Sequence, residues 1–140
     1  MKTKYILLIA AGLLLCLYAC TKNGDTINLA SITGKWNILT DSTYAGAGSS
    51  NHPVNYNGRA GDYFNITANG VIYTKEGVVL DTLNYTMVGD TAMVITAFGI
   101  IANGVPSVSH ITFTGHYLTI TSPKALTPGG IFWRKTSLAR

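Results

Sequence analysis

The apolar and polar positions of this chain follow two patterns, a continuous apolar run near the start and an alternation later on. The run covers residues 5–17 and follows two lysines, Lys2 and Lys4. At about 13 residues it has the length of a signal-peptide core. It is shorter than the roughly 20 apolar residues that a membrane-spanning helix needs. Residues 1–19 are therefore predicted to be a signal peptide.

From Gly34 onward the pattern is typical of β-structure, because valine, isoleucine, threonine and tyrosine are frequent and glycine-containing turns separate alternating runs. Leu29 and Ile32 have the spacing of one helical turn before the first strand. Strands are expected at 35–44, 62–67, 71–75, 81–88, 91–97, 107–114, 117–122 and 130–136. An all-β fold, an eight-stranded antiparallel up-and-down β-barrel, would leave no sheet edge exposed.

Three glycine-containing dipeptides predict which residues share a face, because a two-residue hairpin loop fixes the register of its strands. They are Asn69-Gly70, Gly89-Asp90 and Gly115-His116. The residues expected to face inward beside them are Phe64, Ile66, Val71 and Tyr73; Tyr85, Met87, Ala92 and Val94; and Ile111, Phe113, Leu118 and Ile120. Between Leu80 and Leu83 the inward parity changes, which predicts either a loop over 76–80 or a bulge near Asp81-Thr82.

The longer connections are expected to lie together at one end of the barrel. On an up-and-down path, segments 45–61, 76–80, 98–106 and 123–129 share an end, and the three tight turns share the other. Long loops at one barrel mouth are a common place for recognition. The candidate binding residues at this mouth are Tyr44, Tyr56, Arg59, Phe98 and Ile101.

Length and charge limit the alternatives. The chain has 140 residues, enough for one domain. Removing Lys2 and Lys4 leaves 8 of its 10 basic residues against 6 acidic ones, a net charge of +2. The basic residues form no cluster, so the sequence lacks the footprint of a nucleic-acid-binding protein.

Leu17-Tyr18-Ala19-Cys20 resembles the lipobox of bacterial lipoproteins, with Tyr18 larger than the residue usually found before the final small one. The resemblance implies that Cys20 carries palmitate and other acyl chains and anchors the protein to the cell envelope, at the outer membrane. Residues 20–26 would then be a tether, and residues 27–140 a domain facing the periplasm or the cell surface. The alternative is an ordinary signal peptide with a chance cysteine. The mature chain has one cysteine and so no intrachain disulfide.

Several short motifs resemble those of lipocalins, and the layout is similar to the short lipocalin-like lipoproteins of Bacteroidetes-type bacteria. The motifs are Gly34-Lys35-Trp36, Phe64 to Gly70, Tyr85 to Asp90, and Phe132-Trp133-Arg134. The resemblance implies a barrel closed at one end by a structural pair, in which Arg134 stacks on Trp36. The strands are short and the C-terminal helix of full lipocalins is absent, so the likeness implies a fold more than a transport activity.

No catalytic constellation stands out. His52, His110 and His116 lack the spacing of metal ligands, the acidic residues fall mostly at turns or strand ends, and no pair of carboxylates is expected on one inward face. We therefore expect no enzyme activity, metal or cofactor.

Two functions are left open. One is a lipid-anchored binding module for a small apolar molecule or a peptide segment at the barrel mouth. The other is a structural or interaction lipoprotein whose barrel is filled by its own side chains. The large residues expected inside are Trp36, Phe64, Tyr73, Tyr85, Met87, Phe113, Leu118, Ile120 and either Phe132 or Trp133. They would crowd an eight-stranded interior. An open β-sandwich is a third, less favoured fold.

Overall fold

The computed structural model describes residues 29–44, 55–99, 101–102, 104–127 and 130–140. The predicted signal peptide, Cys20 and most of the tether lie outside these residues, as does most of the 45–61 connection. Within the described part, no helix is long and apolar enough to cross a membrane.

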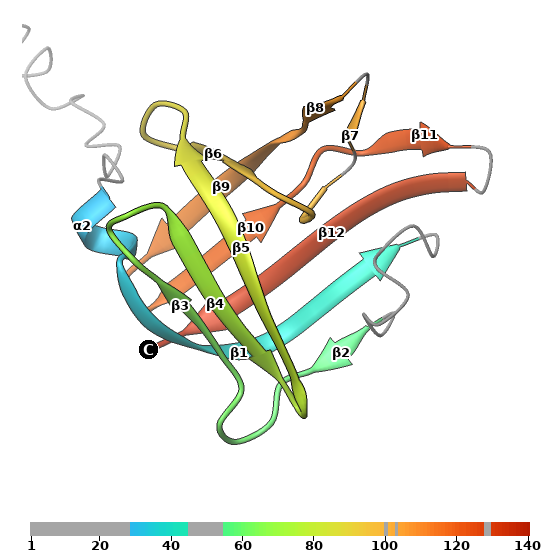
Figure 1. Cartoon of the computed structure of the whole chain (residues 1–140). Coiled ribbons are helices and arrows are strands. Elements are labelled where there is room, and N and C mark those ends of the chain that lie inside the picture. The colour runs from blue at the N-terminus through green and yellow to red at the C-terminus, as the bar shows by residue number, and fades with distance from the viewer. Residues whose placement is uncertain (1–28, 45–54, 100, 103, 128–129) are drawn as a thin grey trace, which may run out of the picture.

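The fold is a closed antiparallel barrel of eight strands in the order β1-β3-β4-β5-β6-β9-β10-β12, with β12 pairing back onto β1. This confirms the predicted fold class (Figure 1). The barrel strands are β1 (Gly34–Tyr44), β3 (Tyr63–Ile66), β4 (Val71–Glu76), β5 (Val79–Met87), β6 (Ala92–Ile95), β9 (Val108–Thr114), β10 (Tyr117–Thr121) and β12 (Gly130–Ala139). The helical turn α2 (Leu29–Ile32) precedes β1. Four short strands lie outside the ring: β2 (Tyr56–Asn57), β7 (Ile101–Ala102), β8 (Val105–Pro106) and β11 (Ala125–Thr127).

One of the three predicted hairpins has the expected register. Thr114 pairs with Tyr117, so Gly115-His116 is a two-residue loop. The positive φ of Gly115, 58°, is what the first central residue of a type II′ turn requires. As predicted, Ile111 lies opposite Ile120 and Phe113 lies opposite Leu118.

The other two hairpins have three-residue loops, so the predicted faces of β4 and β6 are wrong. The N–H of Thr67 donates to the carbonyl of Val71, and the N–H of Val88 donates to that of Ala92. One extra loop residue moves every side chain of the following strand to the other face. The side chains that point inward are therefore Ile72, Met93 and Ile95, whereas Val71, Tyr73, Ala92 and Val94 point outward.

The apparent change of parity near Leu80 comes from neither a loop nor a bulge. β4 and β5 pair without interruption from Val71–Asn84 to Glu76–Val79, and the connection between them is the two-residue turn Gly77-Val78. Leu80 is an outward-facing residue and is 70% exposed. Segment 76–80 is therefore not one of the long mouth connections.

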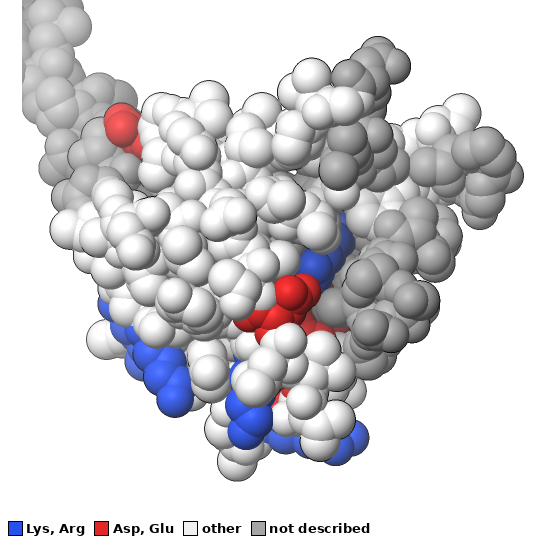
Figure 2. Space-filling view, in the orientation of Figure 1, with Lys and Arg blue, Asp and Glu red and all other residues white. Residues whose placement is uncertain are grey.

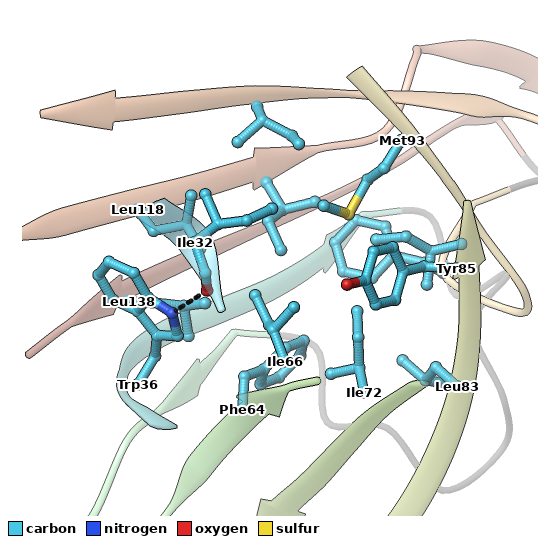
Figure 3. Packing of buried hydrophobic residues seen from close by; sticks show 14 of the residues in the cluster. Ile32, Trp36, Phe64, Ile66, Ile72, Leu83, Tyr85, Met93, Leu118 and Leu138 are labelled. Carbon is cyan, nitrogen blue, oxygen red and sulfur yellow. Dashed lines mark hydrogen bonds between the residues drawn. The ribbon is translucent and has the colours of Figure 1, made fainter. Parts of the chain in front are cut away.

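The closed end of the barrel is filled with apolar side chains. Trp36 is fully buried there, and its Nε1 donates to the carbonyl of Ile32 at 2.7 Å (Figure 3). Its ring meets that of Phe113 edge-to-face at 6.0 Å. The buried cluster around it comprises Ile32, Ile38, Phe64, Ile66, Ile72, Leu83, Tyr85, Met93, Ile95, Phe98, Ile111, Leu118, Ile120 and Leu138. Of the large residues predicted inside, only Tyr73 is exposed, and Phe132 is buried rather than Trp133.

The predicted stacking of Arg134 on Trp36 is wrong. Arg134 lies opposite Thr43, seven residues along β1 from Trp36. The cation over the tryptophan ring belongs to Arg140, whose guanidinium carbon is 4.1 Å from the ring centroid. Arg140 also donates to the carbonyls of Ser31 and Thr33, so the last residue of the chain joins β12 to the helical turn.

A β-bulge at Leu39 divides β1 into two parts with opposite parity. The register with β12 moves from Ile38–Leu138 to Thr40–Ser137, leaving Leu39 without a counterpart. Trp36 and Ile38 point inward before the bulge, and Asp41 and Thr43 point inward after it. Bulges commonly redirect side chains in this way. The extra residue therefore places an aspartate inside the barrel.

Candidate functional site

The interior of the barrel changes from apolar to polar along its axis. Beyond the apolar closed half lies a set of buried polar side chains, which we call the mouth layer: Asp41, Thr43, Thr74, Glu76, Ser109, Ser122, Arg134 and Thr136. Burying charged groups is unfavourable unless they are paired and hydrogen-bonded. The mouth layer is therefore the part of the interior that needs an explanation beyond packing.

Arg134 is at the centre of the mouth layer. Its Nε and Nη2 donate to the two carboxylate oxygens of Asp41 at 3.1 and 2.8 Å. Nη2 also lies 3.6 Å from Glu76 Oε1. The hydroxyl of Thr136 donates to Asp41 Oδ2 at 2.8 Å. A two-pronged arginine–carboxylate pair of this kind holds both side chains in a fixed geometry.

Two carboxylates thus share one guanidinium inside the barrel, which corrects the expectation that no acidic pair faces inward. The bulge at Leu39 and the shifted register of β4 together explain the error. The first turns Asp41 inward, and the second does the same for Glu76, which lies on the same face as Ile72 and Thr74.

Phe98 lies inside the barrel because the chain leaves the wall after β6. The N–H of Thr96 still donates to the carbonyl of Asn84 at 2.8 Å, but Ala97 then adopts a left-handed conformation with φ 60°. Such a conformation costs a non-glycine residue about 1–2 kcal/mol. The change of direction brings the Phe98 ring to 4.6 Å from the Arg134 guanidinium, with 1% of the residue exposed.

Two serine hydroxyls beside this site have no hydrogen-bond partner. They are the Oγ atoms of Ser107 and Ser109, both buried. Ser122 lies close to them: its Oγ accepts from the N–H of Arg134 at 2.8 Å, and a Cβ at Gly99 would lie 2.1 Å from Ser107 Oγ and 3.3 Å from Ser122 Cβ. A buried hydroxyl without a partner costs about 1–3 kcal/mol, so these two groups are suited to receive a polar group from outside the chain.

Asp62 ties the loop before β3 to the β4–β5 turn. Its carboxylate accepts from the Tyr56 hydroxyl at 2.5 Å, the Arg59 N–H at 2.7 Å and the Gly77 N–H at 2.8 Å. Burial on its own would raise the pKa of Asp62, but these hydrogen bonds outweigh it and hold that pKa below its usual value. The same hydrogen bond, together with burial, raises the pKa of Tyr56.

The five candidate binding residues do not form one cluster. Phe98 is a core residue and Tyr56 is a half-buried partner of Asp62, whereas Arg59 is exposed. Tyr44 ends β1 opposite Trp133, and Ile101 pairs with Pro106 in the small β7–β8 sheet. Their role in binding stays a prediction, and for Phe98 it would require the ring to move.

Acidic and basic side chains come together at the surface near the mouth. Figure 2 shows acidic side chains next to a basic one in a hollow of the barrel surface. Glu76 and Arg134 reach solvent at this end with side-chain exposures of 8% and 11%. In the described ranges, no three His, Cys, Asp or Glu side chains are grouped as metal ligands.

The mouth layer was missed by the sequence reasoning because its residues are dispersed over five strands or strand ends, without a local motif. One signal was available: Arg134, Thr136 and Leu138 alternate with Lys135 and Ser137, which placed Arg134 on the same face as a core leucine.

Comparisons with known protein families, with curated proteins and with solved structures find no match for this chain.

Proposed function

We propose that this protein is a lipid-anchored, lipocalin-like binding module of the bacterial cell envelope, without enzyme activity, and that it binds its ligand at the mouth of the barrel. The observation that carries this proposal is the mouth layer, with a shared guanidinium and two unpartnered serine hydroxyls. Replacing a buried ion pair with apolar side chains is often neutral or stabilising, so stability alone does not account for the mouth layer.

The ligand we propose is polar, which narrows the choice left open by the sequence. The closed half is occupied by Trp36, Phe64 and the rest of the core cluster. Above it, Phe98 lies across the interior against Arg134. A wholly apolar molecule, or the hydrocarbon chain of a fatty acid, would have to lie against charged and hydroxyl groups, which is unfavourable. A peptide or another polar molecule could satisfy them.

Photo-crosslinking from the two ends of the barrel tests this proposal. A benzophenone amino acid is placed at Val105 (67% exposed, at the mouth end) or at Thr114 (exposed, at the closed end) of the full-length protein in its own cells. We expect a specific adduct from position 105 and none from position 114. Equal labelling at both positions, or no adduct from either, would favour the self-filled structural barrel instead.

A second measurement separates polar from apolar ligands. The fluorescence of cis-parinaric acid, a fatty acid, increases when it enters an apolar cavity. We expect no increase with the full-length protein in detergent below the micellar concentration. Saturable binding of this probe, competed by oleate, would show that the interior takes apolar molecules and would contradict a polar site.

The lipid anchor is tested at Cys20, with Cys16 as the matched control. Acyl chains contribute about 0.8 kcal/mol per buried methylene, so two or more chains give stable anchoring where one does not. Cys20→Ser should abolish labelling by radioactive palmitate and release the protein from membranes, whereas Cys16→Ser in the signal peptide should change neither. A Cys20→Ser protein that stays in the membrane after a carbonate wash would refute lipidation at this residue.

A further inference from the structure

β5 extends beyond its partner strand on one side of the barrel. It pairs with β4 along its length from Val79 to Asn84, but with β6 only between Tyr85 and Met87. The last backbone hydrogen bond between β5 and the chain that follows β6 runs from the Thr96 N–H to the Asn84 carbonyl. After Ala97 the chain enters the barrel, so no described strand pairs with the outer edge of β5 from Val79 to Thr82.

The backbone groups on this edge can be assigned from the register. Tyr85 donates its N–H to Gly70 on the β4 side, whereas Asn84 accepts on the β6 side, so even-numbered residues of β5 point their backbone groups away from β4. The backbone groups on the unpaired edge of β5 therefore belong to Leu80 and Thr82. Asp81 Oδ1 accepts from the Thr82 N–H at 2.7 Å, which leaves the N–H and C=O of Leu80 and the C=O of Thr82 free to pair.

Within the described residues, the edge carries only one of the features by which proteins usually protect unpaired strands, the inward-pointing charge of Asp81. Lysine, proline, bulges or a covering loop normally prevent pairing with other chains. Here Val79 is 42% exposed and Leu80 70% exposed, and Val78 in the preceding turn is 97% exposed. Asp81 is the one charged residue in β5. A regular, exposed and apolar edge of this kind favours strand addition.

A groove on the outer face of the sheet leads to this edge. It has a volume of about 490 Å³ and is lined by Tyr63, Asn65, Tyr73, Thr74, Leu80, Asp81 and Thr82. The pairing places Asn65, Tyr73 and Thr82 in one outward row and Tyr63, Lys75 and Leu80 in the next. The groove lies between these rows, across β3, β4 and β5, and ends at Leu80 and Thr82, where an added strand would continue both rows.

The inner face of the same edge is acidic. Asp81 lies opposite Thr74, and Val79 lies opposite Glu76, one of the two carboxylates beside Arg134. A strand added to β5 would therefore present one set of alternate side chains to Leu80 and the tyrosine-lined groove, and the other set to these carboxylates. Apolar residues suit the first set, and lysine or arginine suits the second.

We propose that the free edge of β5, from Val79 to Thr82, binds an extended polypeptide segment of a partner protein in which apolar and basic side chains alternate. This inference rests on the proposed function, because it identifies the class of ligand that reaches the mouth. Main-chain hydrogen bonds to Leu80 and Thr82 would provide affinity, and the groove and Asp81 would provide specificity.

The probe for this proposal is an acetylated and amidated octapeptide of alternating valine and lysine, compared with one of alternating valine and glutamate. Backbone amide exchange of the full-length protein in detergent micelles is followed residue by residue. Because exchange then proceeds only from the free fraction, 90% occupancy should slow it about tenfold at the Leu80 N–H. The lysine peptide should produce this effect, and the glutamate peptide should not.

Two pairs of variants keep the result specific to the edge. Leu80→Pro removes the free N–H without breaking a bond to β4 and should abolish binding, whereas Leu80→Ala keeps the N–H and should retain it. Asp81→Lys should reverse the preference toward the glutamate peptide, and Asp90→Lys, in the exposed hairpin loop before β6, should not. The Asp81 pair tests the proposal even if Leu80→Pro fails to fold.

Three outcomes would overturn the proposal. They are an unchanged Leu80 N–H with the lysine peptide, equal protection by both peptides, and protection that grows with protein concentration in the absence of peptide. The third would assign the edge to a second copy of this chain. If the exchange experiment fails while position 105 still gives an adduct, the mouth remains the binding site and only the strand-addition mode is wrong.

Discussion

Removing the guanidinium of Arg134 should destabilise the barrel more than removing the carboxylate of Asp41. In Arg134→Met, the fully buried Asp41 and the nearby Glu76 lose the cation that they share. In Asp41→Asn, the guanidinium keeps Glu76 at 3.6 Å and the ring of Phe98 at 4.6 Å. The two variants differ because Arg134→Met removes the cation shared by two carboxylates, whereas Asp41→Asn leaves the guanidinium beside the second carboxylate.

The magnitudes follow from the contacts that each variant loses. Breaking a buried ion pair by removing one partner costs about 3–5 kcal/mol, and we expect Arg134→Met in that range. Asp41→Asn weakens charge-assisted hydrogen bonds of about 1.5–3 kcal/mol, and the lower value is the closer estimate because the Asn side chain can still accept from Arg134. Since small domains have about 5–15 kcal/mol of total stability, either loss is measurable.

Urea unfolding of the full-length protein in detergent, followed by tryptophan fluorescence, provides the assay because Trp36 is fully buried. The double variant Asp41→Asn/Arg134→Met should be more stable than the sum of the single losses implies, by about 0.5–3 kcal/mol. If Arg134→Met unfolds within 0.5 kcal/mol of the wild type, or if the two losses simply add, the side chains are not coupled and the mouth layer has been misinterpreted.

Three further predictions concern other parts of the barrel. Arg140→Ala should lower the free energy of unfolding by about 1–2 kcal/mol, measured in urea, because it removes the cation over Trp36 and the hydrogen bonds to the carbonyls of Ser31 and Thr33. Arg140→Lys should restore less than half of the loss, and full restoration would argue against stacking. The lowered pKa of Asp62 means that its contribution to stability is complete above about pH 4, the pKa of an unfolded aspartate, and is lost as pH falls through the folded-state value. Asp62→Asn should therefore destabilise less at pH 3 than at pH 7, and an equal effect at both would contradict this. Ala97→Gly should leave stability unchanged or raise it by up to about 1 kcal/mol, since glycine adopts the left-handed conformation without strain, whereas Ala92→Gly in β6 should be destabilising. Thermal melts in which Ala97→Gly is the less stable of the two variants would show that Ala97 is not strained.

The number and order of the barrel strands could be predicted from alternation, but the faces of two strands could not. Asn69-Gly70 is a strong signal for a turn, yet the dipeptide does not distinguish a two-residue loop from a three-residue loop that also uses Ala68. Gly70, with φ 82°, fits the left-handed last position of a three-residue loop. A difference of one residue in the loop reverses Ile72 and Tyr73, so the register depended on a detail of the turn that the strand pattern did not contain.

The candidate site was harder to predict for a related reason. Trp36 was expected to be buried, and it is fully buried, but the cation over its ring belongs to Arg140 rather than to Arg134. Arg134 lies in β12 and Arg140 follows its last residue, an even number of positions away. Alternation therefore places both on the same face of the strand, but it does not show which of them lies at the level of Trp36 along the barrel axis. The burial of Asp41 depends on a bulge, and bulges arise from a mismatch between neighbouring strands rather than from any residue in β1 alone.

The described chain both enters and leaves the barrel at its closed end. α2 packs over that end through Ile32, and Arg140 donates its N–H to the carbonyl of His116 in a tight turn at the same end (Figure 1). Any anchor before Leu29 is therefore joined to the barrel at the end that the apolar core fills. The mouth, at the opposite end, is therefore not the end at which residues before Leu29 join the barrel. A fusion partner or affinity tag attached after Arg140 would likewise sit at the closed end and leave the mouth unobstructed.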